Sequence, residues 1–314
     1  MNQRTILIVT ICGLLTAFLL LSPFGLGMLG FILSPFALMP LFVAVLGFGT
    51  VPGLIAGIVT AVIIAISTSL IGGISTFFVT LGPALWVGHM AGLVRQDEGY
   101  EEWFPLSQIL FRLALLSGVL VLIFGWLSGV DISAISEQVE TGVAQFFEQA
   151  VSRNPELKAP DAGQLAELAS RVTSLLPIVA PASLLLMYAG NLALGARFAR
   201  ARGWILRPED DIAASLALPM HAVGVLAVAI ALSWLGGDLG LIAKIFAGAM
   251  GAAFLLVGLA VMHFYTRDSG GGSVLRVMSY VALFFFQFPA LIFAALGLAE
   301  VLLGLRARKS TPST

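Results

Sequence analysis

The chain has 314 residues, of which 59% are apolar and only 11% are charged. Soluble domains carry roughly 25% charged residues, so this composition excludes a globular protein in water. The formal net charge of −1 argues against a nucleic-acid partner, and the single cysteine, Cys12, excludes a disulfide framework and a cysteine-based zinc site. We therefore expect an integral membrane protein in contact with the lipid bilayer.

The first part of the chain contains five apolar runs separated by short Gly- and Pro-containing clusters. Most have the length of about 18 to 25 residues that a helix needs to cross a bilayer. They lack the alternating polarity of membrane β-strands, so helices are the expected spanning elements. The runs cover residues 5–21, 26–48, 51–71, 75–94 and 104–127, and together they predict an N-terminal transmembrane block over residues 1–127.

Residues 131–171 form the one long polar stretch, with seven acidic and three basic side chains. Apolar side chains recur at steps of three and four residues from Ile132 through Phe146 to Ala150, which predicts an amphipathic helix. A second helix is predicted to start at Asp161, because Gln164 follows three residues later as in a capping box. We therefore predict an extracytoplasmic amphipathic helical segment over residues 128–172, lying along the outer membrane surface or over the mouth of the bundle.

Residues 173–314 return to apolar runs and predict a C-terminal transmembrane block. The runs cover 175–198, 214–234, 239–265 and 273–305. We expect the first to be broken near Pro177 and Pro181. The last is too long for one upright crossing and is divided by Pro289. The fold class is therefore an all-α polytopic transmembrane bundle of about eight to ten crossings, with ten favoured over nine.

Basic residues are distributed unevenly between the connecting segments. Arginines crowd residues 197–207, 267–276 and 306–309, whereas the loops near Gly25, Gly72 and Gly236 contain no Lys or Arg. The positive-inside rule places such basic segments in the cytoplasm, and with them both the N-terminus and the C-terminus.

Motifs for catalysis and for nucleotide hydrolysis are missing from the sequence. No lysine stands in a Walker A context, no His-Glu-x-x-His pair occurs, and no Gly-x-Ser-x-Gly elbow is present. We expect a non-catalytic protein that lacks an ATPase of its own and uses no cofactor and no metal.

Polar side chains at membrane depth are the candidate ligand-binding residues, because their insertion costs free energy. They are Asn191, His221, Gln287 and Glu300. Each has a structural alternative: the amides of Asn191 and Gln287 suit hydrogen bonds between helices, with Asn191 expected to join spans six and seven. His221 suits packing within the bundle, and Glu300 suits pairing with Arg306. Convergence of these side chains on one enclosed space would favour ligand binding.

Small residues at four-residue spacing predict close helix packing within the chain, in preference to contacts between chains. The strongest cases are Gly49, Gly53 and Gly57, the pair Gly13 and Ala17, and the group Ala247, Gly248, Gly251 and Ala252.

Several short motifs resemble those of the YybS-like family of bacterial inner-membrane proteins. They are Asn191-Leu-Ala-Leu-Gly-Ala-Arg197, Leu218-Pro219, Gly258-Leu-Ala-Val-Met-His263 and Gly297-Leu-Ala-Glu300 with Arg306, where the family more often has Asp in place of Glu300. That family distantly resembles the substrate-binding S components of energy-coupling-factor transporters and the rod-shape membrane protein MreD. The resemblance implies a multi-pass protein of the bacterial inner membrane with a small-molecule cavity and a membrane-protein partner.

Two functions follow as hypotheses. The first is a small-molecule binding or transport subunit, similar to an S component, without its own ATPase. The alternative is an assembly or scaffold protein of the cell envelope, similar to MreD.

Overall fold

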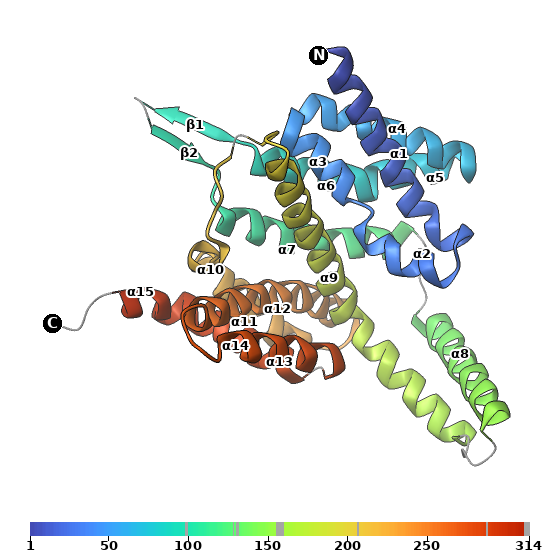
Figure 1. Cartoon of the computed structure of the whole chain (residues 1–314). Helices are drawn as coiled ribbons and strands as arrows, with labels where there is room; N and C mark the ends of the chain where they lie inside the picture. The colour runs from blue at the N-terminus through green and yellow to red at the C-terminus, as the bar shows by residue number, and fades with distance from the viewer. Residues whose placement is uncertain are drawn as a thin grey trace.

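The computed structural model describes residues 1–97, 100–127, 129, 132–154, 160–205, 207–286 and 288–310. Within these residues, seven helical stretches are long and apolar enough to cross a membrane, and three apolar helices are shorter. The predicted all-α polytopic membrane bundle is confirmed (Figure 1).

The first four spans pack together (Figure 1), whereas the fifth expected run, residues 104–127, packs mainly against later helices, so the block over residues 1–127 stays a prediction. Close approaches at glycines hold these four spans together: a Cβ added to Gly13 would lie 2.7 Å from the carbonyl oxygen of Ala56, and one added to Gly53 would lie 2.3 Å from a methyl of Val45. The second and fourth spans are each built from shorter pieces. The elements are α1 (Gln3–Gly25), α2 (Met28–Leu33), η1 (Ser34–Phe36), α3 (Met39–Phe48), α4 (Thr50–Ser67), α5 (Leu70–Thr76), η2 (Phe77–Leu81) and α6 (Gly82–Ala91).

A small antiparallel hairpin follows this block and was not predicted. Its strands are β1 (Val94–Asp97) and β2 (Tyr100–Trp103). Four residues per strand is too short a stretch to give a periodicity signal beside runs of about 20 apolar residues.

The next three helices are α7 (Leu106–Leu127), α8 (Ile132–Arg153) and α9 (Ala162–Ala201). The predicted capping box at the start of α9 is confirmed, with Gln164 N–H donating to Asp161 Oδ1 at 2.8 Å. The predicted break near Pro177 and Pro181 is wrong, because α9 continues as one helix of 40 residues through both prolines. Membrane helices tolerate proline where neighbouring groups satisfy the freed backbone.

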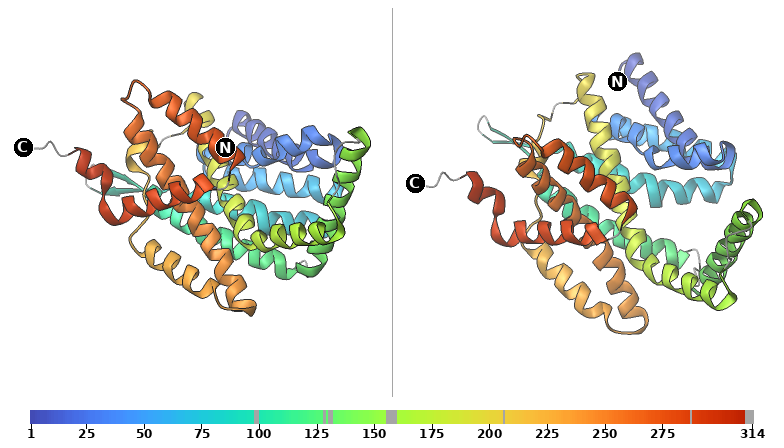
Figure 2. Two further views of the ribbon diagram at one scale, coloured as in Figure 1. Left: turned by 90° about the horizontal axis from the view of Figure 1, so that it is seen from below. Right: turned by 60° about the horizontal axis from the view of Figure 1, so that its bottom comes forward.

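At 1.5 Å per residue, α9 is about 60 Å long, roughly twice the thickness of a hydrocarbon core. Its N-terminal part extends beyond the bundle, and α8 packs along it to form an arm (Figures 1 and 2). The predicted segment boundary at residue 172 therefore lies inside one continuous helix. The amphipathic helix is present as predicted, but Phe146 is 67% exposed, whereas Phe147 is half-buried. Phe146 was assigned to the packed face because the periodicity does not distinguish between neighbouring phenylalanines.

The remaining chain is organised around α12, the most buried span. It packs against α7, α9, α11 and α14. The last apolar run is divided as expected, by an extended residue at Phe286 just before Pro289. The elements are α10 (Ile212–Ser215), α11 (His221–Ser233), α12 (Gly237–Thr266), α13 (Gly272–Phe285), α14 (Phe288–Leu303) and α15 (Leu305–Ser310).

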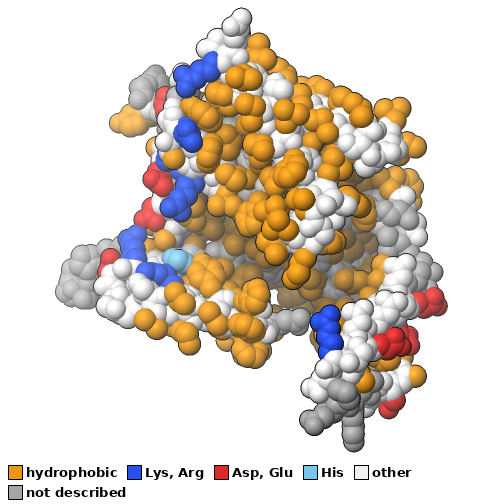
Figure 3. Space-filling model, turned by 45° about the vertical axis from the view of Figure 1, so that its right-hand side comes forward, with side chains coloured by type: hydrophobic (Ala, Val, Ile, Leu, Met, Phe, Trp, Pro, Cys, Tyr) orange, Lys and Arg blue, Asp and Glu red, His pale blue; other side chains and the backbone are white. Residues whose placement is uncertain are grey.

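Charged side chains gather at two ends of the molecule. Figure 3 shows Lys and Arg side chains along one edge, with acidic side chains among them, and mostly acidic side chains on the arm at the other end, with an apolar surface between. We call the first end the basic face; it carries Arg200, Arg207, Arg267 and Arg306. Large apolar side chains are exposed over the surface between the ends, as lipid contact requires.

Candidate ligand cavity

A cavity of about 750 Å³ lies between α7, α9 and the segment that links α9 to α11, and α3, α6 and α12 complete its wall. Its volume falls within the range of roughly 300–1,000 Å³ that is typical of small-molecule sites. The interior is apolar, and its larger side chains are Leu46, Ile109, Leu110, Leu113, Leu186 and Leu256.

The cavity exists because α9 presents small residues on one face. Ala189, Gly190 and Ala193 all line the space, at the three- and four-residue steps that share a helix face. A Cβ added to Gly190 would meet no atom of the described residues within 4 Å. Gly195, on another face of the same helix, is packed instead: its Cβ would lie 2.7 Å from Phe42 Cβ.

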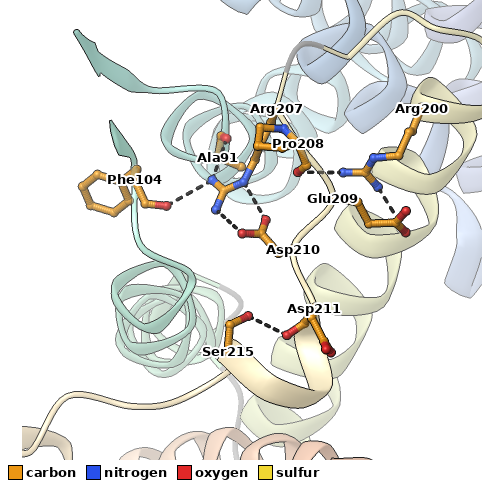
Figure 4. Close-up of polar contacts among 9 residues, drawn as sticks. All are labelled: Ala91, Phe104, Arg200, Arg207, Pro208, Glu209, Asp210, Asp211 and Ser215. Atoms are coloured by element: carbon orange, nitrogen blue, oxygen red, sulfur yellow. Dashed lines mark hydrogen bonds and ion pairs between the residues drawn. The ribbon is translucent and has the colours of Figure 1, made fainter. Parts of the chain in front are cut away.

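Arg207 fixes the polar end of the cavity, at the basic face (Figure 4). It is only 8% exposed, and its guanidinium donates to both carboxylate oxygens of Asp210 at 2.8 and 3.3 Å. The same group donates to the backbone carbonyls of Ala91 at 3.1 Å and Phe104 at 3.0 Å. A buried guanidinium needs such partners. Arg207 therefore joins the linking segment to the end of α6 and to the residue after β2.

Two further arginines at the cavity mouth make fewer and weaker polar contacts with the described residues than Arg207 does. Arg200 donates to the carbonyl of Pro208 at 3.3 Å and lies 3.9 Å from Glu209, whose side chain is 76% exposed (Figure 4). An ion pair this long and this exposed contributes little. Arg197 is exposed, and no hydrogen bond or ion pair joins it to any of the described residues.

The segment that links α9 to α11 has a second set of polar contacts at α10. Asp211 caps this short helix by accepting the N–H of Ala214 at 3.1 Å, and it pairs with Arg267 at 2.7 Å. The backbone N–H of Ala214, with the Arg267 guanidinium in support, holds the pKa of Asp211 below its ordinary value. Asp211 therefore stays ionised and keeps this contact with the end of α12 at neutral pH.

Comparison with known proteins identifies the family. The family described as predicted membrane protein, DUF2232, matches residues 13–301. The chain belongs to this family. No curated protein and no solved structure matched the chain. The match includes all the residues that line the cavity and all the spans except the first half of α1.

In this family member, Asn191 does not join spans six and seven as predicted. The side chain is 2% exposed, and its Nδ2 donates to the carbonyl of Pro35 at 2.7 Å and to that of Met187, one turn earlier, at 2.7 Å. It therefore joins α9 to η1, where the broken second span brings a backbone carbonyl to α9. Its Oδ1 is buried and accepts no hydrogen bond from the described residues.

The other candidate residues lie apart from the cavity. The ring of His221 lies 4.5 Å from that of Phe111, and His221 lines a separate apolar groove between α11 and α12. Gln287 lies outside the described residues. The three described candidates thus do not converge on one space, and their binding of a ligand stays a prediction.

Glu300 forms the ion pair that its spacing indicated. Its Oε1 accepts from Arg306 Nε at 3.0 Å, and both side chains are buried. Arg306 also donates to the carbonyls of Ala213 at 2.8 Å and Leu216 at 2.7 Å. The pair therefore links α14 and α15 to α10 and the residue that follows it.

The arginines of residues 197–207 were predicted only to mark the cytoplasmic side, and their place at a cavity was not predicted. A signal was present: small residues recur on one face of the sixth span and lead, on the same face, to Arg197 and Arg200. Without the partner helices, such a face is indistinguishable from a packing surface.

Proposed function

We propose that the protein is a non-catalytic membrane subunit that binds a small molecule in the cavity beside α9, and that it serves a transport process without an ATPase of its own. The cavity is the observation that carries this proposal. It combines an apolar interior with a few charged groups at one end, which is the composition of small-molecule sites.

Filling the cavity tests this proposal. Gly190→Leu places a side chain in the open space, and Gly251→Leu is the matched control, since a Cβ on Gly251 also meets no described atom within 4 Å but lies outside the cavity lining. Native mass spectrometry of gently purified protein should show a retained small molecule in the wild type and in Gly251→Leu, and its loss in Gly190→Leu. Retention of the same molecule by Gly190→Leu would contradict the proposal.

We also propose that the protein lies in the bacterial inner membrane with the basic face, and both termini, in the cytoplasm. The charge asymmetry supports this orientation. In a Cys12→Ser background, a membrane-impermeant maleimide should label Thr141→Cys on α8 in intact cells. It should label Asp268→Cys, at the basic face, only after permeabilisation. Both native side chains are exposed, so the reverse pattern would show the opposite orientation.

The arm supports the alternative of an envelope scaffold. It consists of α8 and the N-terminal part of α9, extends beyond the bundle and exposes Phe146 (Figure 2). A photo-crosslinking residue at position 146 should capture one specific envelope protein if the arm recruits a partner. Crosslinks to lipid alone would count against the scaffold.

A further inference from the structure

We propose that the ligand of the cavity is an amphipathic anion: a hydrocarbon chain that lies between α7 and α9, with a phosphate or carboxylate head at Arg197 and Arg200. This inference rests on the proposed function, because it names the class of molecule that the same cavity takes.

The apolar walls of the cavity favour a ligand with a hydrocarbon chain. Away from the mouth, the lining consists of Leu, Ile, Ala and Gly side chains. A ligand with hydroxyl or amide groups along its length would leave those groups without partners in this space, which costs free energy. A hydrocarbon chain has no polar groups that would be left unpaired, and the small residues of α9, centred on Gly190, give it room.

The arginines at the mouth of the cavity favour a ligand with an anionic head group. Arg207 and Asp210 neutralise each other through two hydrogen bonds. Arg200 has only the long, exposed contact with Glu209, and Arg197 has no partner among the described residues. The two free or weakly held guanidiniums lie three residues apart near the end of α9, on the face that lines the cavity. Guanidiniums bind phosphate and carboxylate oxygens in bidentate geometry, whereas a cationic head would be repelled here.

A second apolar groove provides a comparison, because no arginine lines it among the described residues. The groove between α11 and α12, about 480 Å³, is lined by apolar side chains and His221, and no Lys or Arg belongs to its lining among the described residues. It can accept lipid chains but has no cation to select a head. The cavity beside α9 combines both features, so it can select a charged amphiphile from the bulk lipid.

Four probe molecules distinguish the contribution of the hydrocarbon chain to binding from that of the head group. The protein is reconstituted in phosphatidylcholine nanodiscs. The probes are dodecyl phosphate, dodecanoate, dodecanol and inorganic phosphate, with retention measured by native mass spectrometry over a concentration series. We expect the two anionic amphiphiles to bind about tenfold or more tightly than dodecanol or inorganic phosphate, because only they use both the walls and the arginines.

Three variants assign the site. The double variant Arg197→Gln/Arg200→Gln should weaken dodecyl phosphate about tenfold and leave dodecanol unchanged. Arg202→Gln is the matched control, since Arg202 lies in the same basic segment but stacks over Phe198 and does not line the cavity. It should change neither probe. Gly190→Leu should remove binding of every probe that carries a chain.

The outcomes separate this inference from the proposed function. Equal binding of dodecanol and dodecyl phosphate, both abolished by Gly190→Leu, would leave the binding function standing and overturn the anionic head. Equal weakening by Arg202→Gln would indicate attraction to the basic face in general and would also overturn the inference. Binding that Gly190→Leu does not change would overturn the cavity as the site, and with it both proposals.

Discussion

The crossing of α12 and α14 provides the sharpest test of the packing. A Cβ added to Gly258 would lie 1.8 Å from the carbonyl oxygen of Phe293, and one added to Gly297 would lie 2.0 Å from that of Phe254. The backbones of the two helices are therefore in direct contact at a pair of glycines. Since a carbon and a carbonyl oxygen approach no closer than about 3.3 Å, Gly258→Ala must move the helices apart by about 1.5 Å.

The free energy of unfolding that Gly258→Ala should lose can be worked out from this separation. Overpacking in a closed interface costs typically about 1–3 kcal/mol, and a rigid shift of a whole helix falls at the upper end. Replacing glycine by alanine within a helix also stabilises the folded state by about 0.5–1 kcal/mol, because alanine loses less backbone entropy on folding. We therefore expect Gly258→Ala to lower the free energy of unfolding by about 2 kcal/mol. Gly251→Ala, two turns earlier on α12, has open space at its Cβ and should be neutral or stabilising.

Equilibrium unfolding in mixed micelles of dodecyl maltoside and dodecyl sulfate, followed by far-UV circular dichroism, measures this difference. Gly297→Ala should resemble Gly258→Ala. The double variant should cost less than the sum of the two, because helices already separated accommodate the second methyl group. Equal midpoints for Gly258→Ala and Gly251→Ala would refute direct backbone contact between α12 and α14.

Three further predictions concern the polar contacts. Glu300→Gln removes the carboxylate that pairs with the buried Arg306 guanidinium, so the free energy of unfolding, measured as above, should fall by about 3 kcal/mol; an unchanged value would show that the pair is solvated. Asn191→Leu removes the hydrogen bond to Pro35 but also an unsatisfied oxygen, so stability should change by less than about 1 kcal/mol. For Asp211, whose pKa is lowered chiefly by the α10 backbone N–H, the stabilising contact is complete above the unfolded-state pKa of about 3.9 and is lost as the pH falls through the lower folded-state value. Protease protection of residues 207–220 should therefore decline below about pH 4 in the wild type, and Asp211→Asn should lack this decline.

The elements that the sequence predicted correctly are those with local causes. The capping box at Asp161 needs only a partner three residues away, and the amphipathic helix from Ile132 needs only its own periodicity. The spans followed from the length of apolar runs, because a bilayer fixes the length of helix that crosses it. The division of the last run near Pro289 had the same local origin.

The polar contacts were not predictable, because their partners are distant backbone groups. Asn191 donates to a carbonyl 156 residues earlier, and Arg207 donates to carbonyls 116 and 103 residues earlier. Every residue has a backbone carbonyl, so no sequence pattern marks these acceptors. Glu300 was the exception, since its partner Arg306 lies only six residues later in the sequence.

Small residues show most clearly why the cavity escaped sequence reasoning. Gly258 and Gly190 both stand in apolar helices among Ala and Leu, and each permits close approach of a second helix. At Gly258 that approach takes place, and the backbone of α14 occupies the space. At Gly190 the opposing position is filled by no atom of the described residues, because α7 faces α9 across the cavity instead of touching it there. Whether a small residue makes a contact or a binding site thus depends on where the partner helix is held, and here the bonds of Arg207 fix the segment that borders the open space.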